Sequence, residues 1–494
     1  MSGRFALLVL ALVAACRCET PPSDVTIPIG VSLFDPAFEW TCSPDENVGC
    51  EGVFPVRDAS GGASPGTVTP ITGPEALGVR LLSLAAAQRS IRIQALIFRA
   101  DETGLAIAAL LKQRKADGLD VRVIVDAASN LDWQTQWMYF DLKRSGVEVE
   151  GYEALYLEWL TAEKLYDPLH ANKRFHDKLW IVDGEDSERG MAIVGGLNLA
   201  NEYFRVASEP LQRWRDQDVL LRGAIVQDPL TAFDRNYDFF KGIKGRLPRV
   251  LDPDNAWKLS ATLQQRIAGV DIPTWTDATL RAAVDATTRT DPGQSWAPAA
   301  IRFLQSRPRF HESYILQAYL AEIENAEHSI LVANAYFIPS RQVADALLRA
   351  VDRGVEVVVL TNSPASNDIA QVATMSRHGY RRLMRADGSG VKIHEWIGPA
   401  AGEGTLHAKL ALFDEREAIV GSYNLDPRSE RLNSETAIAI RDPGMVAELA
   451  RRFREEMLPL SAPITFAQAG TFQDPPELAS KFELLYSMPL ASWL

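Results

Sequence analysis

Two copies of one histidine-containing pattern are the residues of this sequence best suited to chemistry. Each copy places a lysine two residues after a histidine and an aspartate five residues after the lysine, in FHDKLWIVD and again in TLHAKLALFD. A single His-x-Lys is usually a solvated strand edge or a structural histidine, but repetition of the whole pattern argues against that interpretation. The two sets are His176, Lys178 and Asp183, and His407, Lys409 and Asp414.

These side chains suit displacement at a phosphodiester. A neutral imidazole can attack phosphorus, and a protonated imidazole can give its proton to the leaving oxygen. Lys178 and Lys409 would bring positive charge to the phosphoryl oxygens, and Asn198 and Asn424, downstream of the two copies, would add amide donors. Because the lysines supply the charge that a metal ion would otherwise bring, the pattern predicts neither a metal nor another cofactor.

The segments around both copies indicate an α/β fold. From residue 76 onwards, helical stretches alternate with the apolar stretches IRIQALIF and VRVIVD, and ILVANAYF and VEVVVL follow in the same order later in the chain. Repetition of this order predicts two copies of one α/β unit. We therefore expect a first lobe, a connecting segment, a second lobe and a tail at 76–250, 251–300, 301–460 and 461–494.

The paired motifs closely resemble the phospholipase D superfamily. Each His-x-Lys-x4-Asp is followed by Gly-Gly or Gly-Ser and then Asn, and GGLNLANEY, AYFIPS and GSYNLDPRSERLNSE are similar to its bacterial cardiolipin synthase branch. The resemblance covers roughly residues 76–460. It implies two similar lobes, each a mixed sheet flanked by helices, that share one active-site cleft.

The resemblance also implies supporting roles for other residues. Glu202 and Glu435 are the candidates for orienting the histidines, and His176 is the expected nucleophile. We expect Asp183 and Asp414 to make structural hydrogen bonds rather than to react, because a regular strand would place them on the face opposite the lysines. Two further supporting candidates follow the second motif, Ser422 and Arg428, the latter as an ion pair or as a second phosphate contact.

The first residues of the chain have the three-part form of a bacterial secretory signal. One arginine precedes a short apolar run, and small residues lead to Cys16 in the lipobox-like stretch VAAC. We expect a signal peptide at 1–15, acylation of Cys16, and an irregular lipid-anchored tether at 16–75. This predicts an exported, membrane-anchored lipoprotein of the periplasm or cell envelope that works on a phospholipid membrane.

The remaining global features limit the possible partners. The chain has 494 residues and a net charge of −13, which argues mildly against nonspecific nucleic-acid binding. Cys42 and Cys50 bracket a turn-rich stretch, so a small disulfide loop is expected in an exported protein. The cysteine and histidine spacing does not suggest a zinc site.

Three weaker candidates have an ordinary structural interpretation beside a functional one. Trp133 and Trp137 have helical spacing and suit packing, or else an acyl-chain groove. The pair His378 and Tyr380 is a candidate for a phosphate or headgroup contact. The basic run at 241–249 is usually a solvated surface, although it would suit anionic headgroups at a membrane.

Four functions compete at this point. The leading hypothesis is a membrane-tethered, cardiolipin synthase-like phosphatidyltransferase that acts on phosphatidylglycerol or related lipids through a phosphohistidine. A phospholipase D that releases phosphatidic acid would use the same intermediate and resolve it with water. An exported nuclease of the same superfamily and a non-enzymatic lipid-binding module are less favoured, because of the acidic charge and the complete motifs respectively.

Overall fold

The structure is a computed structural model. The predicted signal peptide, Cys16, residues 251–296 of the connecting segment and residues 473–494 of the tail lie outside the residues that it describes. The basic run is described only to residue 245. The described residues are Val25, Ile27, 30–57, 66–126, 129–130, 132–151, 174–206, 213–245 and 297–472.

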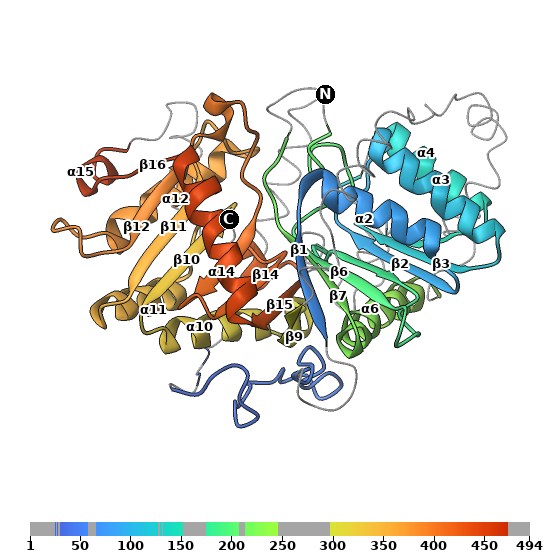
Figure 1. Cartoon of the computed structure of the whole chain (residues 1–494), viewed down its shortest axis with the longest axis horizontal. Helices are drawn as coiled ribbons and strands as arrows, with labels where there is room; N and C mark the ends of the chain where they lie inside the picture. The colour runs from blue at the N-terminus through green and yellow to red at the C-terminus, as the bar shows by residue number, and fades with distance from the viewer. Residues whose placement is uncertain are drawn as a thin grey trace, which may run out of the picture.

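An eight-stranded mixed sheet forms the first lobe (Figure 1). Its strands β2, β3 and β4 pair in parallel, and the other neighbours pair antiparallel. In spatial order the strands are β4 (Glu148–Glu150), β3 (Asp120–Val125), β2 (Ser90–Ala95), β5 (Leu179–Val182), β6 (Met191–Gly195), β7 (Asp218–Arg222), β1 (Thr67–Ile71) and β8 (Ala297–Pro298).

The second lobe repeats this sheet. Its strands β10, β11 and β12 are parallel, and the other neighbours are antiparallel. The order is β16 (Ser461–Pro463), β12 (Lys392–Trp396), β11 (Glu356–Asn362), β10 (Ser329–Asn334), β13 (Lys409–Phe413), β14 (Glu417–Gly421), β15 (Glu435–Arg441) and β9 (Ala300–Ser306). From β12 to β9 the arrangement matches β4 to β1, which confirms the predicted pair of similar lobes.

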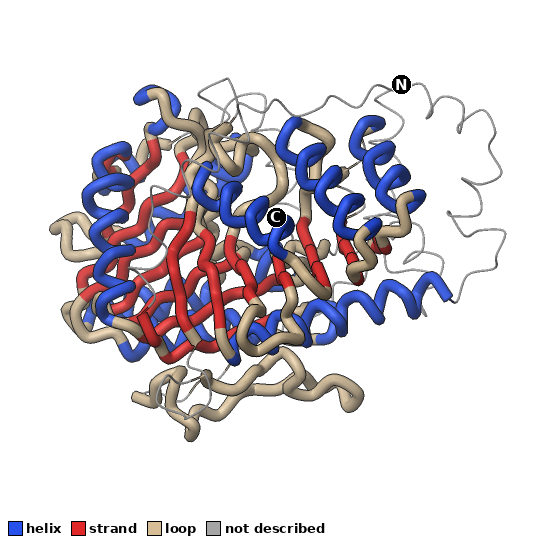
Figure 2. The backbone as a smooth tube through the Cα atoms, turned by 45° about the vertical axis from the view of Figure 1, so that its right-hand side comes forward, coloured by secondary structure: helices blue, strands red, loops and turns tan. Residues whose placement is uncertain are grey.

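Helices surround the strand layers (Figure 2). Helices α3 and α4 are preceded by the N-cap residues Asp101 and Asp132, whose carboxylates accept backbone N–H groups of the first turn. The outer faces carry α2 (Gly73–Ala86), α3 (Glu102–Ala116) and α4 (Trp133–Arg144) in the first lobe, and α10 (Tyr314–Asn325), α11 (Arg341–Asp352) and α12 (Ala370–Leu383) in the second. The inner side carries α6 (Gln227–Gly245) and α14 (Pro443–Arg452), and α13 (Pro427–Arg431) and α15 (Phe466–Ala469) are short.

The alternation of side chains along the strands divides the core into three clusters. In β5, Leu179 and Ile181 face a central cluster, whereas Trp180 and Val182 face the outer helices of the first lobe. β13 behaves in the same way towards the central and second-lobe clusters. The central cluster contains residues of both lobes, so the two sheets are held together by one continuous apolar core.

The N-terminal part of the described chain is more integrated than a tether. Thr67–Ile71 forms β1 inside the first sheet, and Val53 and Arg57 form bridges with Leu304 and Ile301 of the second lobe. The predicted tether boundary at residue 75 is therefore wrong, because the backbone groups of these residues find partners in both lobes. Cys42 and Cys50 form the predicted disulfide in this segment.

The predicted edges of the second lobe also differ from the structure. β8 precedes residue 301 and pairs with β1 of the first lobe, and β16 follows residue 460 and pairs with β12. Short strands such as these carry too little periodicity to be found from sequence. Among the described residues, no helix combines the length and the apolar composition needed to span a membrane.

Candidate active site

Both motif histidines are placed by backbone contacts between the lobes. The regular strands β5 and β13 begin only after the histidines. The N–H of His176 donates to the carbonyl of Ser434 at 2.9 Å, and the N–H of His407 donates to the carbonyl of Arg215 at 2.7 Å. Each histidine is thus fixed by the lobe to which it does not belong, and the two motifs lie in one composite site.

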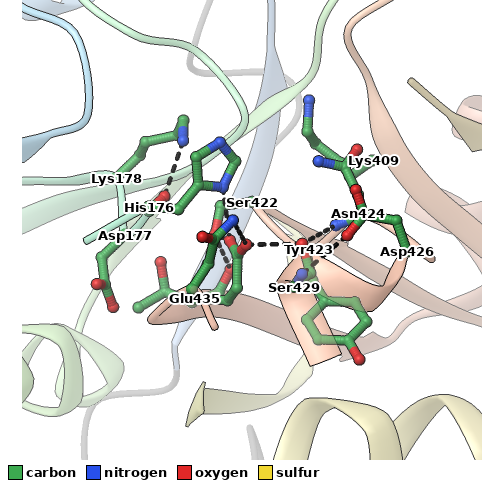
Figure 3. A network of polar contacts seen from close by, with 12 residues as sticks. His176, Asp177, Lys178, Lys409, Ser422, Tyr423, Asn424, Asp426, Ser429 and Glu435 are labelled. Atoms are coloured by element: carbon green, nitrogen blue, oxygen red, sulfur yellow. Dashed lines mark hydrogen bonds and ion pairs between the residues drawn. The ribbon is translucent and has the colours of Figure 1, made fainter. Parts of the chain in front are cut away.

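A carboxylate from the opposite lobe also holds each imidazole. His176 Nδ1 lies 2.7 Å from Glu435 Oε2, and His407 Nδ1 lies 2.6 Å from Asp216 Oδ2. Figure 3 shows His176 between Lys178 and Glu435. For His176, the acceptor at Nδ1 assigns the proton to that nitrogen and leaves Nε2 of a neutral ring with its lone pair free, whereas His407 Nδ1 also has Lys409 Nζ at 2.9 Å. This tautomer suits attack on phosphorus.

Glu435 sits at the centre of a polar network. Its Oε2 accepts the Ser422 hydroxyl at 2.5 Å in addition to His176, and its Oε1 accepts the Ser429 hydroxyl at 2.8 Å and the Asn433 amide at 3.4 Å. Burial alone would raise the pKa of Glu435, but His176, Lys178 and Ser422 together lower it. The carboxylate is therefore anionic at neutral pH and rigidly oriented.

The partner of His407 is Asp216, which the sequence prediction missed. The predicted residue, Glu202, instead accepts a hydrogen bond from Arg99 at 2.5 Å. Asp216 lies two residues before the start of β7, whose first residue pairs with Gly195. In the same way, Glu435 lies two residues before the residue of β15 that pairs with Gly421. Alignment of these two strands of the repeat, rather than of the GGLN and GSYN segments, would have found it.

Gly196 provides the space that Asp216 needs. A Cβ atom at Gly196 would lie 2.2 Å from Asp216 Oδ1 and 2.8 Å from its Oδ2, which is too close for any real contact. The second lobe has Ser422 in the corresponding place, and there the hydroxyl donates to the longer side chain of Glu435. The Gly-Gly and Gly-Ser variants of the motif therefore match a short and a long carboxylate.

The two lysines are buried beside the histidines. Lys178 is 3% exposed and Lys409 is fully buried, and each Nζ donates to the carbonyl of the histidine two residues earlier. Burial lowers the pKa of Lys178 to about 7, with Glu435 opposing the shift and Lys409 adding to it. Burial also lowers the pKa of Lys409. Two desolvated cations near each other favour an anionic ligand such as a phosphodiester.

Burial keeps both imidazoles neutral in the free protein. It lowers the pKa of His176 to about 4, and Glu435 only partly opposes this. The pKa of His407 is also lowered well below its usual value, by burial and then by Lys409. Burial raises the pKa of Asp216 to about 6, against the effect of Lys409. An anion between the lysines would reverse part of their effect and favour protonation of one histidine.

The motif aspartates make structural hydrogen bonds. The Asp183 carboxylate accepts the backbone N–H groups of Gln88, Arg89 and Ser90 at 2.7–3.1 Å. The Asp414 carboxylate does the same for residues 327–329 at 2.7–3.0 Å. Both aspartates have positive φ values, 50° and 53°, at the end of the strand. Asp183 thus connects its motif strand to the start of β2, and Asp414 connects its motif strand to the start of β10. Neither aspartate contacts a motif histidine.

The two asparagines are buried near the motifs. Asn198 Oδ1 accepts the N–H of Ile97 at 3.1 Å, and its amide also interacts with the Tyr203 phenol. Asn424 is 3% exposed, and its backbone N–H donates to Ser429. Arg428 is half-buried, and its charge interacts with Asp426, Arg174 and Glu435. Its place beside Glu435 is compatible with either of the two roles predicted for it.

Aromatic side chains flank His407. The Trp214 ring stacks on the imidazole with centroids 5.2 Å apart, and the Tyr203 ring meets it edge-on at 5.2 Å. Neither contact could be predicted from the sequence, because both residues follow the first motif while His407 belongs to the second. Among the described residues, no group of three or more His, Cys, Asp or Glu side chains is placed to hold a metal ion.

The weaker candidate residues differ in their exposure to solvent. Tyr380 is fully buried and packs edge-on against Phe472, so the headgroup contact predicted for it is wrong. Its spacing on α12 turns it into the second-lobe core, whereas His378 on the same helix is exposed. Trp137 lies on α4 and is half-buried. The side chain of Trp133 lies outside the described part.

Comparison with known proteins agrees with this geometry. The chain is 28% identical over 397 residues to the cardiolipin synthase of Geobacillus thermodenitrificans, and 28% identical over 385 residues to that of Geobacillus kaustophilus. These matches cover 80% and 78% of this chain but only 66% and 64% of the relatives. The chain thus spans somewhat less than two thirds of the length of these curated relatives.

A solved structure shares the fold. The phosphatidylserine synthase of Haemophilus influenzae superposes with a TM-score of 0.56 at 13% identity, over 87% of this chain and 96% of that one. The model of the family described as cardiolipin synthase, PLD-like domain, matches residues 81–234 and 319–457, one segment in each lobe. These two segments make up more than half of the chain and contain both motifs. The chain belongs to this family.

Proposed function

We propose that the protein is a phosphatidyltransferase that forms cardiolipin from phosphatidylglycerol or a related phospholipid through a phosphohistidine. The observation that carries the proposal is the pair of neutral, buried histidines, each held at Nδ1 by a carboxylate of the opposite lobe. Two buried lysines beside them provide the positive charge that a phosphodiester requires. The resemblance to cardiolipin synthases supports the lipid substrate.

In the proposed reaction, one imidazole Nε2 attacks phosphorus and the headgroup alkoxide leaves with a proton from the other histidine. The phosphatidyl group is then bonded to the first histidine. In the second step the deprotonated second histidine takes a proton from an acceptor hydroxyl, whose oxygen attacks phosphorus and displaces the first histidine. Lys178 and Lys409 would stabilise the charge on the phosphoryl oxygens in both steps.

We assign attack to His176 and proton transfer to His407. Glu435 holds His176 through a carboxylate that is itself fixed by Ser422, Ser429 and Asn433, which suits a nucleophile of defined orientation. Close to His407 lies an additional carboxylate, Asp368, which raises the pKa of that imidazole against the larger effect of burial. The negative charge of Asp368 would stabilise the imidazolium that forms when His407 takes a proton from the acceptor hydroxyl.

Transfer rather than hydrolysis requires that an alcohol compete with water. We propose that acylation of Cys16 keeps the protein at a membrane, where acceptor headgroups are concentrated and confined. The predicted lipidation and export carry this part of the proposal. If the anchor is present, intact mass analysis of the protein should show an acylated N-terminus, and Cys16→Ser should leave membranes or fail to mature.

The test is the set of products formed in bilayers that contain phosphatidylglycerol. Cardiolipin should exceed phosphatidic acid, and dilution of the lipid with detergent should shift the products towards phosphatidic acid. Phosphatidic acid as the main product in undiluted bilayers would support the hydrolase instead. His176→Ala, with His328→Ala as a control at an exposed histidine of the second lobe, identifies the reaction as that of this site.

A further inference from the structure

A tyrosine and an aspartate of the second lobe form a pair close to His407. Tyr336 follows β10, and the N–H of the preceding residue, Ala335, donates to the carbonyl of Ala408 at 3.1 Å. The last residue of β10, Asn334, is the register partner of Lys409. Tyr336 is therefore carried by backbone that lies directly against the second motif.

Asp368 reaches the same place from a neighbouring strand. It lies in the connection between β11 and α12. The side chain of Asn362, at the end of β11, donates to the carbonyl of Leu406 at 2.7 Å and accepts the N–H of Leu406 at 3.1 Å. The connection thus starts beside the residue that precedes His407. The Tyr336 hydroxyl lies 2.7 Å and 2.8 Å from the two oxygens of Asp368 and donates its proton to this carboxylate.

The charge of Asp368 affects the pKa values of the second motif. Burial and Lys409 lower the pKa of His407, and Asp368 is the first group that opposes them. The same carboxylate also acts on Lys409. Asp368 is exposed, unlike the carboxylates that hold the histidines, so it has access to a ligand. A carboxylate oxygen has two lone pairs, and one proton from Tyr336 leaves acceptor capacity on both oxygens.

Two exposed apolar side chains lie on, or next to, the connection that carries Asp368. The next residue, Ile369, is 44% exposed, and Ile397 is 40% exposed. The connection also contacts the segment of Ile397, because the Ser363 hydroxyl donates to the carbonyl of Trp396 at 3.0 Å. Within the described part of the chain, these two and Leu82 of α2 are the large hydrophobic side chains that are exposed. An exposed acceptor beside exposed apolar side chains suits a ligand with both a polar headgroup and a hydrocarbon part.

We propose that Asp368, positioned by Tyr336, binds the hydrogen-bond-donating headgroup of the phospholipid on the His407 side of the site. The ligand chemistry is a hydroxyl or ammonium group on the alcohol that leaves or attacks with the help of His407. The inference rests on the proposed function and adds a specificity-determining residue to it. The first lobe has Ile97 where the second has Tyr336, since Phe98 and Phe337 correspond in the repeat. The headgroup is thus bound by the second lobe.

The experiment compares initial rates of cleavage of four substrates by the full-length protein in the same detergent. Phosphatidylglycerol offers hydroxyl donors, phosphatidylethanolamine an ammonium donor, and phosphatidylmethanol no headgroup donor. Bis(p-nitrophenyl) phosphate has neither a headgroup donor nor acyl chains. The variants are Asp368→Asn and Tyr336→Phe, and Asp352→Asn is the control because it removes another exposed carboxylate of the second lobe.

We expect Asp368→Asn to lower kcat/KM for phosphatidylglycerol, phosphatidylethanolamine or both by about 10- to 100-fold relative to phosphatidylmethanol, as loss of a charged hydrogen bond requires. Tyr336→Phe should act in the same direction and less strongly. A fall for one donor lipid alone identifies a hydroxyl or an ammonium headgroup as the ligand. Asp352→Asn should leave all ratios unchanged.

Two results would overturn the inference while leaving the proposed function intact. If Asp368→Asn slows all four substrates equally, Asp368 acts only through His407; if it slows none, the carboxylate does not bind the headgroup. A wild-type protein that cleaves none of the four substrates would instead overturn the proposed function, and the inference with it. The two failures are therefore distinguishable in one set of assays.

Discussion

The two lobes place their histidines with the same backbone contacts but hold them with different carboxylates. The first-lobe histidine is held by the long side chain of Glu435, with Ser422 beside it, and the second-lobe histidine by the short side chain of Asp216 against Gly196. Glu435 accepts four side-chain donors, whereas Asp216 accepts His407 and the N–H of Gln217. A duplicated scaffold has thus kept its geometry while its two halves have acquired different electrostatics.

That difference is the basis for dividing the chemistry between the halves. The lowered pKa of Glu435 and the raised pKa of Asp216, which burial brings to about 6, show that one carboxylate is firmly anionic and the other much less so. Asp368 adds a further negative charge on the His407 side. It is one of the groups that act most strongly on the pKa of His407. A nucleophile needs fixed orientation, and an acid–base group needs a proton that moves easily.

The largest expected effect is the loss of either histidine. His176→Ala and His407→Ala should each lower kcat by at least about 10³-fold, because nucleophile and proton donor act as one unit. Near-normal activity in either variant would show that the lobes work independently. Activity on phosphatidylglycerol measures the effect, and circular dichroism checks that the fold is retained.

The carboxylates test the asymmetry more sharply. Asp216→Asn and Glu435→Gln should each cost about 10²–10⁴-fold in kcat, as loss of a histidine-orienting carboxylate does elsewhere. Only Glu435→Gln should also lower the free energy of unfolding clearly, by about 1–3 kcal/mol, because an amide cannot accept all four donors. Glu202→Gln is the control and should retain activity. Equal stability losses in the first two variants would contradict the difference between the lobes.

The pH dependence should report the buried lysines. The pKa of Lys178 is lowered to about 7 by burial, so its charge is present below this pH and is lost above it. We therefore expect kcat/KM to fall above pH 7 by up to about tenfold per unit, because the free enzyme loses a cation that binds the phosphodiester. Lys178→Arg should move this fall to higher pH, since a guanidinium stays charged. A flat profile from pH 7 to 9 in the wild type would reject this role.

The prediction with the smallest effect on activity concerns stability at a site far from the chemistry. Glu322 of α10 is buried near Glu417 of β14, where the first lobe has Ser83 and Met191 at the corresponding positions. Burial and the second carboxylate raise the pKa of Glu322 well above its usual value. The folded protein therefore keeps a proton that the unfolded chain releases above about pH 4.5. The free energy of unfolding falls as the pH rises from this value towards the raised pKa of Glu322 in the folded protein.

Replacement of this buried acid should remove the pH dependence. Glu322→Gln should be more stable than the wild type at pH 8 and close to it at pH 4.5, by up to about 1.4 kcal/mol per pH unit between the two pKa values. Urea unfolding at both pH values measures the difference. Equal pH dependence in variant and wild type would show that Glu322 does not hold its proton.

The sequence was sufficient for the parts of the site that follow a repeated local pattern. The motif residues and the two lobes are visible because the same spacing occurs twice, and Glu435 was a candidate because of the resemblance to the phospholipase D superfamily. The contact between Asp216 and His407 was missed, because residues far apart in the chain meet there and Glu202 is a nearer match in the linear motif. Linear similarity cannot tell which of two neighbouring carboxylates points into the site.

Short-range sequence patterns also failed to predict exposure and contacts that depend on tertiary packing. The spacing of His378 and Tyr380 does not reveal that one is exposed and the other buried in the second-lobe core. The irregular composition of residues 30–57 concealed their contacts with both lobes, which include the ion pair of Arg57 with Asp228 at 2.6 Å. Tertiary contacts of this kind have no periodicity for a sequence analysis to detect.

The most direct test of the account is to count and locate the covalent intermediate. Wild-type protein is mixed with phosphatidylglycerol labelled in its phosphate, quenched within one turnover under conditions that preserve phosphohistidine, and mapped by peptide. One site built from both lobes, with divided roles, predicts at most one labelled group per chain, on the peptide that contains His176. Two groups per chain, or label confined to His407, would contradict it.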